Sequence, residues 1–247
     1  MNNTLKTNKR DAGFSLIELV IAMTITLVVL GIATTLIARS LNIRTRANEN
    51  VDALADAERA LNIMSREIAQ AGFNLAPPDN GIVAADSVTD GNGNSTIRIR
   101  ANLNKFDTSA SDGARAGISL AGEDSGEDIK YYIYLTQGTS LLARYDQYAS
   151  GGPASTVLAN RLDSFHVHYF AQKVTYSTQV LANGRAGCDI TGASSAEVAP
   201  NLATYVVIAV CVQQSATGKP GDPGYQPAYN LLLTSDVALR NANLVNY

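Results

Sequence analysis

The sequence predicts an α+β protein in which a long N-terminal α-helix packs on a mainly antiparallel β head. Three observations lead to this fold class. Residues 14–38 form an apolar run, residues 54–71 carry an apolar stripe at helical spacing, and the chain beyond Pro78 breaks into short apolar and β-branched runs. A chain of 247 residues is long enough for one medium domain with appendages.

The composition is that of a folded chain with few charges. Hydrophobic residues make up 46% and charged residues 17%, with a formal net charge of −3. A nucleic-acid binder needs a basic face that neutralises phosphates. The most basic segments are short, since residues 6–10 and residues 39–46 each hold only three basic side chains. We therefore predict no nucleic-acid partner.

The apolar run has the length of a membrane span. Residues 19–38 contain no charged side chain, and as a helix they extend over roughly 30 Å, the thickness of a bilayer's hydrocarbon core. Lys6, Lys9 and Arg10 precede the run. By the positive-inside rule they stay in the cytoplasm, and residues beyond 38 lie outside it. This arrangement predicts a single-pass protein.

Two ordinary explanations of this segment leave something out. A secretory signal peptide has a shorter apolar region, followed by a small-residue cleavage site that is missing here. A plain membrane anchor fits the length but gives no reason for Glu18, the one charge in the run. A carboxylate in the middle of a membrane costs about 2.5–3.5 kcal/mol, so it needs a partner.

The segment GFSLIEL at residues 13–19, after a basic leader and before a long apolar helix, resembles the processing site of type IV pilins and type II secretion pseudopilins. The resemblance implies that a prepilin peptidase cuts between Gly13 and Phe14 and methylates the new N-terminus on Phe14. Glu18 lies one helical turn further on and can pair with that amine or with the amine of a neighbouring subunit. Residues 1–13 are then a cytoplasmic leader that is removed, and residues 14–38 a membrane helix that later becomes filament core.

The helix is expected to continue beyond the apolar run. Leu54, Ala57, Leu61, Met64, Ile68 and Ala71 follow one another at spacings of three and four, which predicts an apolar stripe packed on a sheet. A coiled-coil seam is the alternative, but the heptads are too few. Charged residues between them, Glu67 included, are assigned to a solvated face. We expect residues 39–73 to form an amphipathic continuation that Gly72 and Pro77–Pro78 end.

Residues 74–247 are predicted to form one mainly β head. Short runs rich in apolar, β-branched and aromatic residues alternate with turn-forming clusters. The expected strands are residues 82–88, 96–101, 129–136, 140–145, 165–171, 204–213 and 230–237.

The segment LNIMSREIAQAGF, residues 61–73, resembles PilW-like minor pilins and the J-type secretion pseudopilin. The resemblance implies a structural, non-enzymatic subunit that primes assembly of a type IV pilus and takes part in its tip complex. Other minor and major pilins and a large tip adhesin are the implied partners. The implied location is the bacterial inner membrane, with the head in the periplasm, and then the filament. A type II secretion pseudopilin and an adhesive or ligand-binding pilin are the alternatives.

Cys188 and Cys211 are the two cysteines. In an exported head they are expected to form a disulfide, whereas in a cytosolic protein they would be buried thiols. The membrane topology favours the disulfide.

The head offers little candidate chemistry. Asp90–Asn94 places oxygen ligands as in the start of a calcium loop, but Ala101 stands where the bidentate acid belongs, so a turn is favoured. His166 and His168 face the same side of an expected strand and could begin a zinc site, but no third ligand is evident. No catalytic motif is present. We predict no enzymatic activity, no cofactor and no metal site.

Overall fold

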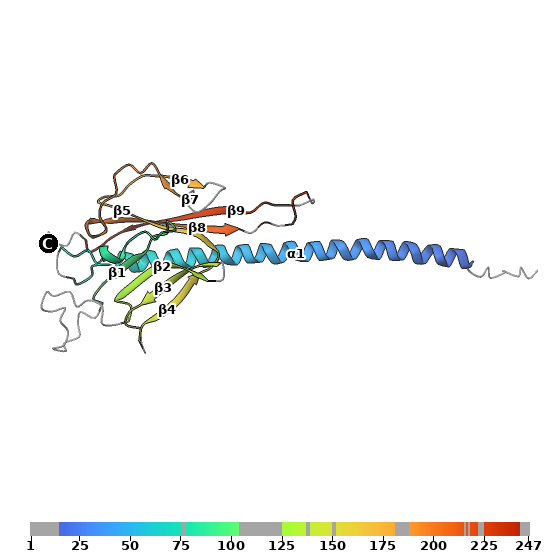
Figure 1. Ribbon diagram of the computed structural model, residues 1–247, viewed down its shortest axis with the longest axis horizontal. Coiled ribbons are helices and arrows are strands. Elements are labelled where there is room, and N and C mark those ends of the chain that lie inside the picture. Colours follow the sequence, from blue (N-terminus) through green and yellow to red (C-terminus); the bar gives the residue numbers. More distant parts are fainter. Residues whose placement is uncertain are drawn as a thin grey trace, which may run out of the picture. The chain divides into compact units, whose positions relative to one another are not determined.

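The computed structural model describes residues 15–75, 78–103, 125–136, 139–149, 152–180, 188–214, 216, 218–221 and 225–242. The chain divides into two compact units, Met1–Ala47 and Asn48–Tyr247. The predicted fold class is confirmed, since a long N-terminal helix packs against antiparallel sheets (Figure 1). The expected leader, with Gly13, and the expected N-terminal residue Phe14 lie outside the described residues.

Helix α1 runs over Leu16–Ala69, a stretch without proline. It ends two residues earlier than the apolar stripe suggests, and Gly72 follows in the left-handed region with φ of 77°. The C-terminal segment of the chain caps this end. The Arg240 N–H donates to the Ala69 carbonyl at 3.4 Å, and the Asn241 amide donates to the carbonyls of Gln70 and Ala71. Carbonyls that lack a helical partner are thereby satisfied.

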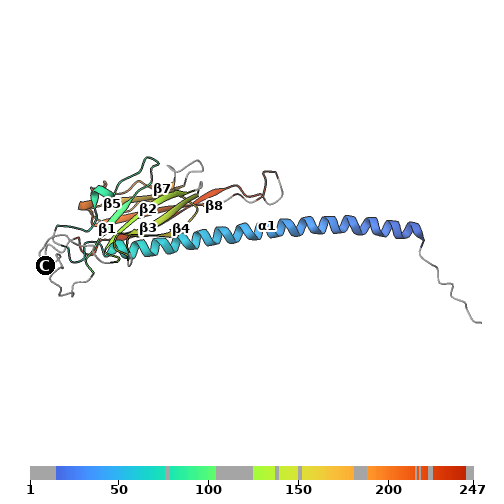
Figure 2. The same ribbon diagram turned by 60° about the horizontal axis from the view of Figure 1, so that its bottom comes forward.

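Within the second unit, α1 buries one face against the head. Its buried residues are Ala53, Ala57, Ala60, Leu61, Met64 and Ile68. The sequence analysis placed Leu54 on this face, but Leu54 is only half-buried, and the smaller Ala53 and Ala60 are buried in its vicinity. Alanines lack bulk, so they let the helix approach the strands closely. In Figure 2 the strands lie along one side of this part of the helix.

The strands form three antiparallel sheets. The first has the order β1-β2-β3-β4 and consists of Ile97–Arg100, Asp128–Thr136, Thr139–Asp146 and Ala154–Ala159. The second has the order β5-β8-β9 and consists of Leu162–Phe170, Tyr205–Gln214 and Tyr229–Ala238. The third is the hairpin β6-β7, Ser177–Val180 and Cys188–Thr191. Two short 3₁₀ turns, Ala84–Asp86 and Pro200–Leu202, complete the described elements.

Most of the expected strands are present, as β1, β2, β3, β5, β8 and β9. The strand expected at residues 82–88 is wrong. Ile82 and Thr89 make single bridges, and the Ala84–Asp86 turn separates them. The sequence analysis missed β4, β6 and β7. All four residues of β6 and the first four of β4 are exposed, so neither strand shows a buried-exposed alternation.

Strand β8 is the centre of the head and is buried on both faces. Val206, Ile208, Val210 and Val212 point into the core that contains the buried face of α1. Tyr205, Val207 and Ala209 alternate with them and point into a second, smaller core with Phe170, Val174 and Ile190. Figure 1 shows the β6-β7 hairpin beside the β5-β8-β9 sheet. A continuous run of apolar residues is the expected sequence of a strand covered on two sides.

Two glycines allow the helix end to meet β1. The Gly72 N–H donates to the Arg100 carbonyl at 2.9 Å. A Cβ on Gly81 would lie 2.0 Å from the Gly72 nitrogen and 2.5 Å from the Arg100 oxygen. Only a residue without a side chain fits there, and its φ of 81° also favours glycine.

A polar clamp joins the helix to the first sheet. Glu67 on α1 accepts hydrogen bonds from Tyr131 on β2 and from Arg144 on β3, whose Nε lies 3.0 Å from Glu67 Oε2. The Glu67 and Arg144 side chains expose 18% and 19% of their surfaces. Burial, together with the Glu67 carboxylate, raises the pKa of Tyr131, which therefore stays a neutral donor. The sequence analysis assigned Glu67 to the solvated face, and this was wrong.

Glu67→Ala is expected to lower the free energy of unfolding by about 2 kcal/mol, because Arg144 and Tyr131 would lose their shared acceptor while staying buried. Urea unfolding of the full-length protein in detergent, followed by circular dichroism, measures this loss. The matched control is Glu58→Ala, an exposed acid on the same helix, which should change stability by less than about 0.5 kcal/mol. Equal effects of the two substitutions would contradict the clamp.

Candidate functional site

The first unit presents an uncovered apolar surface on α1. Every large hydrophobic side chain from residue 16 to residue 41 exposes at least half of its surface, and Leu16 exposes 80%. Among the described residues, α1 is the one helix long and apolar enough to cross a membrane. A helix that is apolar all round belongs in lipid or in a protein core rather than in water.

The polar side chains of this segment are satisfied within the helix itself. The hydroxyls of Thr24, Thr26, Thr34 and Thr35 each donate to a carbonyl three or four residues earlier, at 2.7–3.0 Å. They therefore need no partner outside the helix. Glu18 is the one charged side chain between residues 16 and 38. An apolar environment thus suits the segment everywhere except at this carboxylate.

Glu18 lies in the first turn of α1, where it caps the helix. Ser15 precedes the helix, and its carbonyl accepts the N–H groups of Glu18 and Leu19. The Ser15 N–H in turn donates to Glu18 Oε2 at 3.4 Å. Ser-x-x-Glu is the sequence of a capping box, and its Glu satisfies a backbone donor at the helix start. The sequence analysis did not use this signal, although it lies within the GFSLIEL segment.

The capping position matters for the charge of Glu18. A helix N-terminus carries a partial positive charge, which stabilises a carboxylate in the first turn. The same geometry directs the carboxylate towards the backbone of Ser15, the residue after Phe14. A new amine on Phe14 would therefore arise one residue from the group that Glu18 already contacts.

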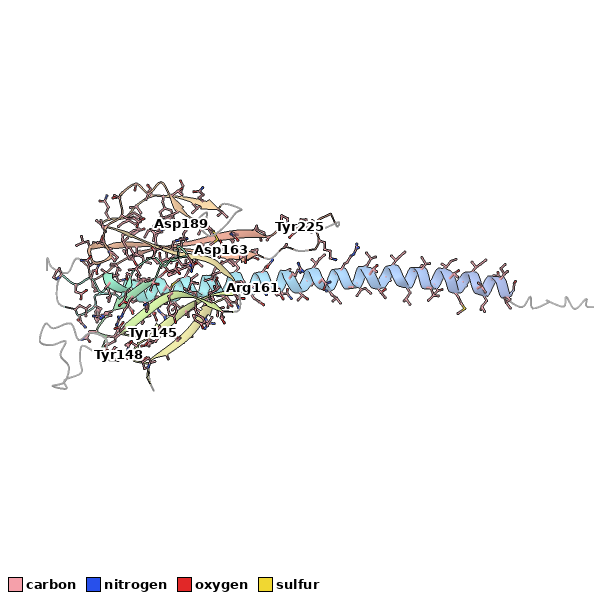
Figure 3. The ribbon with its side chains drawn as sticks, in the orientation of Figure 1. Tyr145, Tyr148, Arg161, Asp163, Asp189 and Tyr225 are labelled. Carbon is pink, nitrogen blue, oxygen red and sulfur yellow. A yellow bond between two sulfur atoms is a disulfide. The ribbon has the colours of Figure 1, made fainter. Side chains whose placement is uncertain are left out.

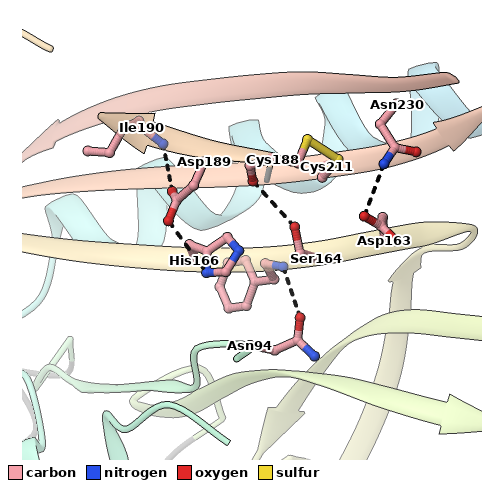
Figure 4. Close-up of a disulfide and its surroundings, with 10 residues drawn as sticks. Asn94, Asp163, Ser164, His166, Cys188, Asp189, Ile190, Cys211 and Asn230 are labelled. Atoms are coloured by element: carbon pink, nitrogen blue, oxygen red, sulfur yellow. Dashed lines mark hydrogen bonds and ion pairs between the residues drawn. A yellow bond between two sulfur atoms is a disulfide. The ribbon is translucent and has the colours of Figure 1, made fainter. Parts of the chain in front are cut away.

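In the head, the predicted disulfide between Cys188 and Cys211 is present, with the two Cα atoms 5.9 Å apart. Cys188 begins β7 and Cys211 lies in β8, so the bond ties the β6-β7 hairpin to the central strand (Figure 4). Both cysteines are fully buried. A covalent link across a separation of 23 residues restricts the unfolded chain and thereby stabilises this layer by about 3 kcal/mol.

The two histidines take part in an ionic cluster beside the disulfide. His168 contacts Asp189 through Nε2 and Glu197 through Nδ1, each at 2.8 Å. His166 lies 3.7 Å from the other oxygen of Asp189. Figure 3 shows Asp189 among the side chains of the head, and Figure 4 shows it between the hairpin and His166. Both nitrogens of His168 are occupied by carboxylates, and no group of three candidate metal ligands occurs among the described residues.

The contacts of this cluster determine the protonation states of His168 and Asp189. Burial opposes protonation of His168, but the hydrogen bonds to Asp189 and Glu197 outweigh it and raise its pKa to about 9. Burial likewise opposes ionisation of Asp189, yet the His168 contact holds its pKa below the usual value. An imidazolium between two carboxylates therefore links β5 to the β6-β7 hairpin, in addition to the disulfide that links the hairpin to β8.

The Asp90–Asn94 segment is a turn. Asp90 Oδ1 accepts the N–H groups of Asn92 and Asn94, both at 2.8 Å. The Asn94 Oδ1 accepts the Phe165 N–H at 3.3 Å, which joins the turn to β5 (Figure 4). These oxygens accept hydrogen bonds that hold the turn together and join it to β5.

Comparison with known proteins finds a family match for the N-terminal segment. Residues 8–34 match the family described as the prokaryotic N-terminal methylation motif. Neither a curated protein nor a solved structure matches the chain. In this motif and in the long apolar helix that carries it, the chain is similar to type IV pilins and pseudopilins. The motif implies processing by prepilin peptidase, and with the apolar helix it indicates a precursor anchored in the inner membrane that later enters a filament.

The His168 cluster predicts that the head loses stability at alkaline pH. The folded-state pKa is about 9 and the ordinary value 6.5, so the stabilisation is full below pH about 6.5 and disappears as the pH rises through about 9. Urea unfolding at the two ends of this range measures the change. His168→Gln should remove most of the pH dependence, because glutamine does not titrate. Wild-type protein equally stable at both ends would contradict the prediction.

Proposed function

We propose that this chain is a minor, PilW-like subunit of a type IV pilus, a structural protein without catalytic activity. It is made as a precursor whose leader, residues 1–13, is removed between Gly13 and Phe14. Residues 14–38 first anchor it in the inner membrane and then pack in the filament. Residues 39–73 and 74–247 form the amphipathic helix and the periplasmic head. The observation that carries the proposal is an uncovered apolar helix whose one charge lies in its first turn, inside a methylation motif.

The chemistry of the first turn supports a role in assembly. Removal of the leader leaves an ammonium on Phe14, next to the Ser15 N–H that Glu18 contacts. In the dry core of a filament, an isolated ammonium and an isolated carboxylate would each be costly. Pairing Glu18 with its own amine or with that of a neighbour removes both costs at once. When the amine is that of a neighbour, Glu18 selects the position at which a subunit docks.

The proposal of a PilW-like subfamily rests on sequence resemblance and not on any contact within the structure. The segment at residues 61–73 resembles PilW-like minor pilins and also the J-type pseudopilin of type II secretion, which shares the leader and a related head. The partners distinguish the two functions. A priming complex of minor pilins with a large tip adhesin defines the pilus, whereas secretion components define the pseudopilus.

Affinity purification of the mature protein from membranes, with its partners identified by mass spectrometry, tests this function. We expect other minor pilins, the major pilin and a large tip adhesin to co-purify, since subunits that prime a filament contact one another. Untagged membranes are the control. Recovery of secretion components in place of the adhesin would assign the chain to a type II secretion pseudopilus and not to a pilus. A preparation free of other pilin-like chains would overturn the filament proposal itself.

Substitution of Glu18 separates its charge from its capping role. Glu18→Gln keeps an acceptor for the Ser15 N–H but removes the charge, while Glu18→Ala removes both. If pairing with the Phe14 amine drives docking, both variants should be cleaved normally and both should enter filaments about tenfold less, the loss expected for one charged hydrogen bond. Immunoblots of sheared filaments measure incorporation, and the mass of the mature chain measures cleavage.

The matched control for these variants is Glu58→Gln, which neutralises an exposed acid on the amphipathic part of α1. It should assemble at the wild-type level. Normal assembly of Glu18→Gln together with failure of Glu18→Ala would show that the cap matters and that the charge does not.

A further inference from the structure

Strand β9 is the outer strand of the β5-β8-β9 sheet and has an open edge. In Figure 4 it lies on the far side of β8 from β5. With 10 residues, β9 is the longest of the edge strands that the structure describes. An edge strand presents unpaired N–H and C=O groups that a further strand can bond, so natural proteins shorten, bend, charge or cover such edges.

The other edges of the two larger sheets have this protection. The loop before β1 covers the edge of that strand, where the Arg100 N–H donates to the Gly81 carbonyl at 2.7 Å. Ser95 covers the edge of β5 by donating its N–H to the Phe165 carbonyl, also at 2.7 Å. Strand β4 is short and pairs with β3 through a register shift. By contrast, β9 from residue 229 to residue 235 contains no charge, no proline and no register shift.

A hydrogen bond at the start of β8 shows which backbone groups of β9 face outward. In an antiparallel pair, residues that bond to the partner strand alternate with residues that point away from it. The Leu239 N–H, just after β9, donates to the Thr204 carbonyl at 2.9 Å. In the unbroken register that follows, the odd-numbered residues of β9 bond to β8. The N–H and C=O groups of Asn230, Leu232 and Thr234 therefore point outward, and no backbone hydrogen bond to them occurs among the described residues.

Apolar side chains flank this edge on both faces of the sheet. Leu233 packs against the main core on the α1 side, and Leu232 packs against the smaller core under the β6-β7 hairpin. Together with Leu231 they are only half-buried, because the described sheet ends at β9. A strand added at this edge would cover the leucines and supply backbone partners at the same time.

Asp236 places one charge near the C-terminal end of the edge. Its exposed side chain accepts the Tyr176 hydroxyl at 2.6 Å. In the part of the chain that the structure describes, no ion pair involves this carboxylate. An added strand with a basic side chain at this position would complement the charge.

The direction of β9 disfavours a second copy of β9 as the added strand. Ser235 Oγ lies 2.7 Å from Ser65 Oγ, and Arg240, further along, donates its N–H to the Ala69 carbonyl. Strand β9 thus runs in the same direction as α1. Two β9 strands paired antiparallel would turn their α1 helices in opposite directions, which does not suit two chains anchored in one membrane with their leaders on the same side.

We propose that the edge of β9 binds an extended segment of another protein chain by strand addition. The segment pairs antiparallel with residues 230–236, places apolar side chains beside Leu231 and Leu233, and places a basic side chain opposite Asp236. Main-chain hydrogen bonds supply the affinity, and the pattern of apolar and basic side chains supplies the specificity. This interaction is additional to the proposed filament role and does not depend on it, because all the contacts belong to the head.

Fluorescence anisotropy on the full-length protein in detergent tests the proposal. The probe is an acetylated, fluorescein-labelled peptide, Lys-Val-Thr-Val-Thr-Val-Thr, whose lysine lies opposite Asp236 in the antiparallel register. We expect a Kd on the order of 100 μM, because so short a peptide buries little surface. The matched peptide with glutamate in place of lysine should bind at least about threefold more weakly. Absence of binding by the lysine peptide, or equal binding by both peptides, would overturn the proposal.

Proline substitutions separate strand addition from other kinds of binding. Thr234→Pro removes an outward N–H, so it should weaken peptide binding at least about tenfold and leave the urea midpoint nearly unchanged. The matched control Ser235→Pro removes an N–H that bonds to β8, and it should lower the midpoint. Undiminished peptide binding by Thr234→Pro contradicts strand addition, and so does an equal loss of stability in the two variants.

Asp236→Asn tests the same edge without a change in the backbone. The variant keeps an acceptor for the Tyr176 hydroxyl, so the head should remain folded. It should lose the preference for the lysine peptide over the glutamate peptide. A preference that persists in this variant would place the peptide away from β9, and the proposal would then fail.

Discussion

The burial of one face of α1, from Ala53 to Ile68, is the contact on which the rest of the head depends. Residues of both larger sheets enter the same core as this face, so the helix provides a common surface for strands far apart in the sequence. The polar contacts follow from it. Glu67 reaches Tyr131 and Arg144 because the apolar residues around it bring the helix against β2 and β3. The caps from Arg240 and Asn241 then close the helix end.

In the first unit, by contrast, the apolar side chains of α1 are not buried against other parts of the chain. The threonine hydroxyls there donate to carbonyls three or four residues earlier in the helix. A surface of this kind is stable only in lipid or against other apolar helices. Glu18 is the exception, because it places a carboxylate at the N-terminal end of this apolar surface, where a new amine can arise. Anchoring and assembly are thus two uses of one surface.

Strand β8 divides the head into layers with different roles. Its α1 side is closed by the main core, while its other side carries the hairpin that the Cys188–Cys211 bond and His168 hold in place. Its neighbour β5 links this layer to the loop that carries Ser95, through hydrogen bonds at Phe165 and Val167.

The features that sequence alone determined are those encoded locally. The methylation motif, the apolar run and the stripe spacing need only neighbouring residues, and so do the β runs that became β1, β2, β3, β5, β8 and β9. The capping box of Ser15 and Glu18 was equally readable, although it was overlooked. Tertiary structure decided the features that depend on contacts between distant residues. Ala53 and Ala60 are buried on the helix face where the sequence had indicated Leu54, and β4, β6 and β7 exist because they pair with other strands. Glu67 and His168 form their ionic contacts with residues at least 20 positions away in the sequence. Helical and strand periodicity records which side of an element is apolar, but only packing determines which charged or hydroxyl group ends up buried beside which partner.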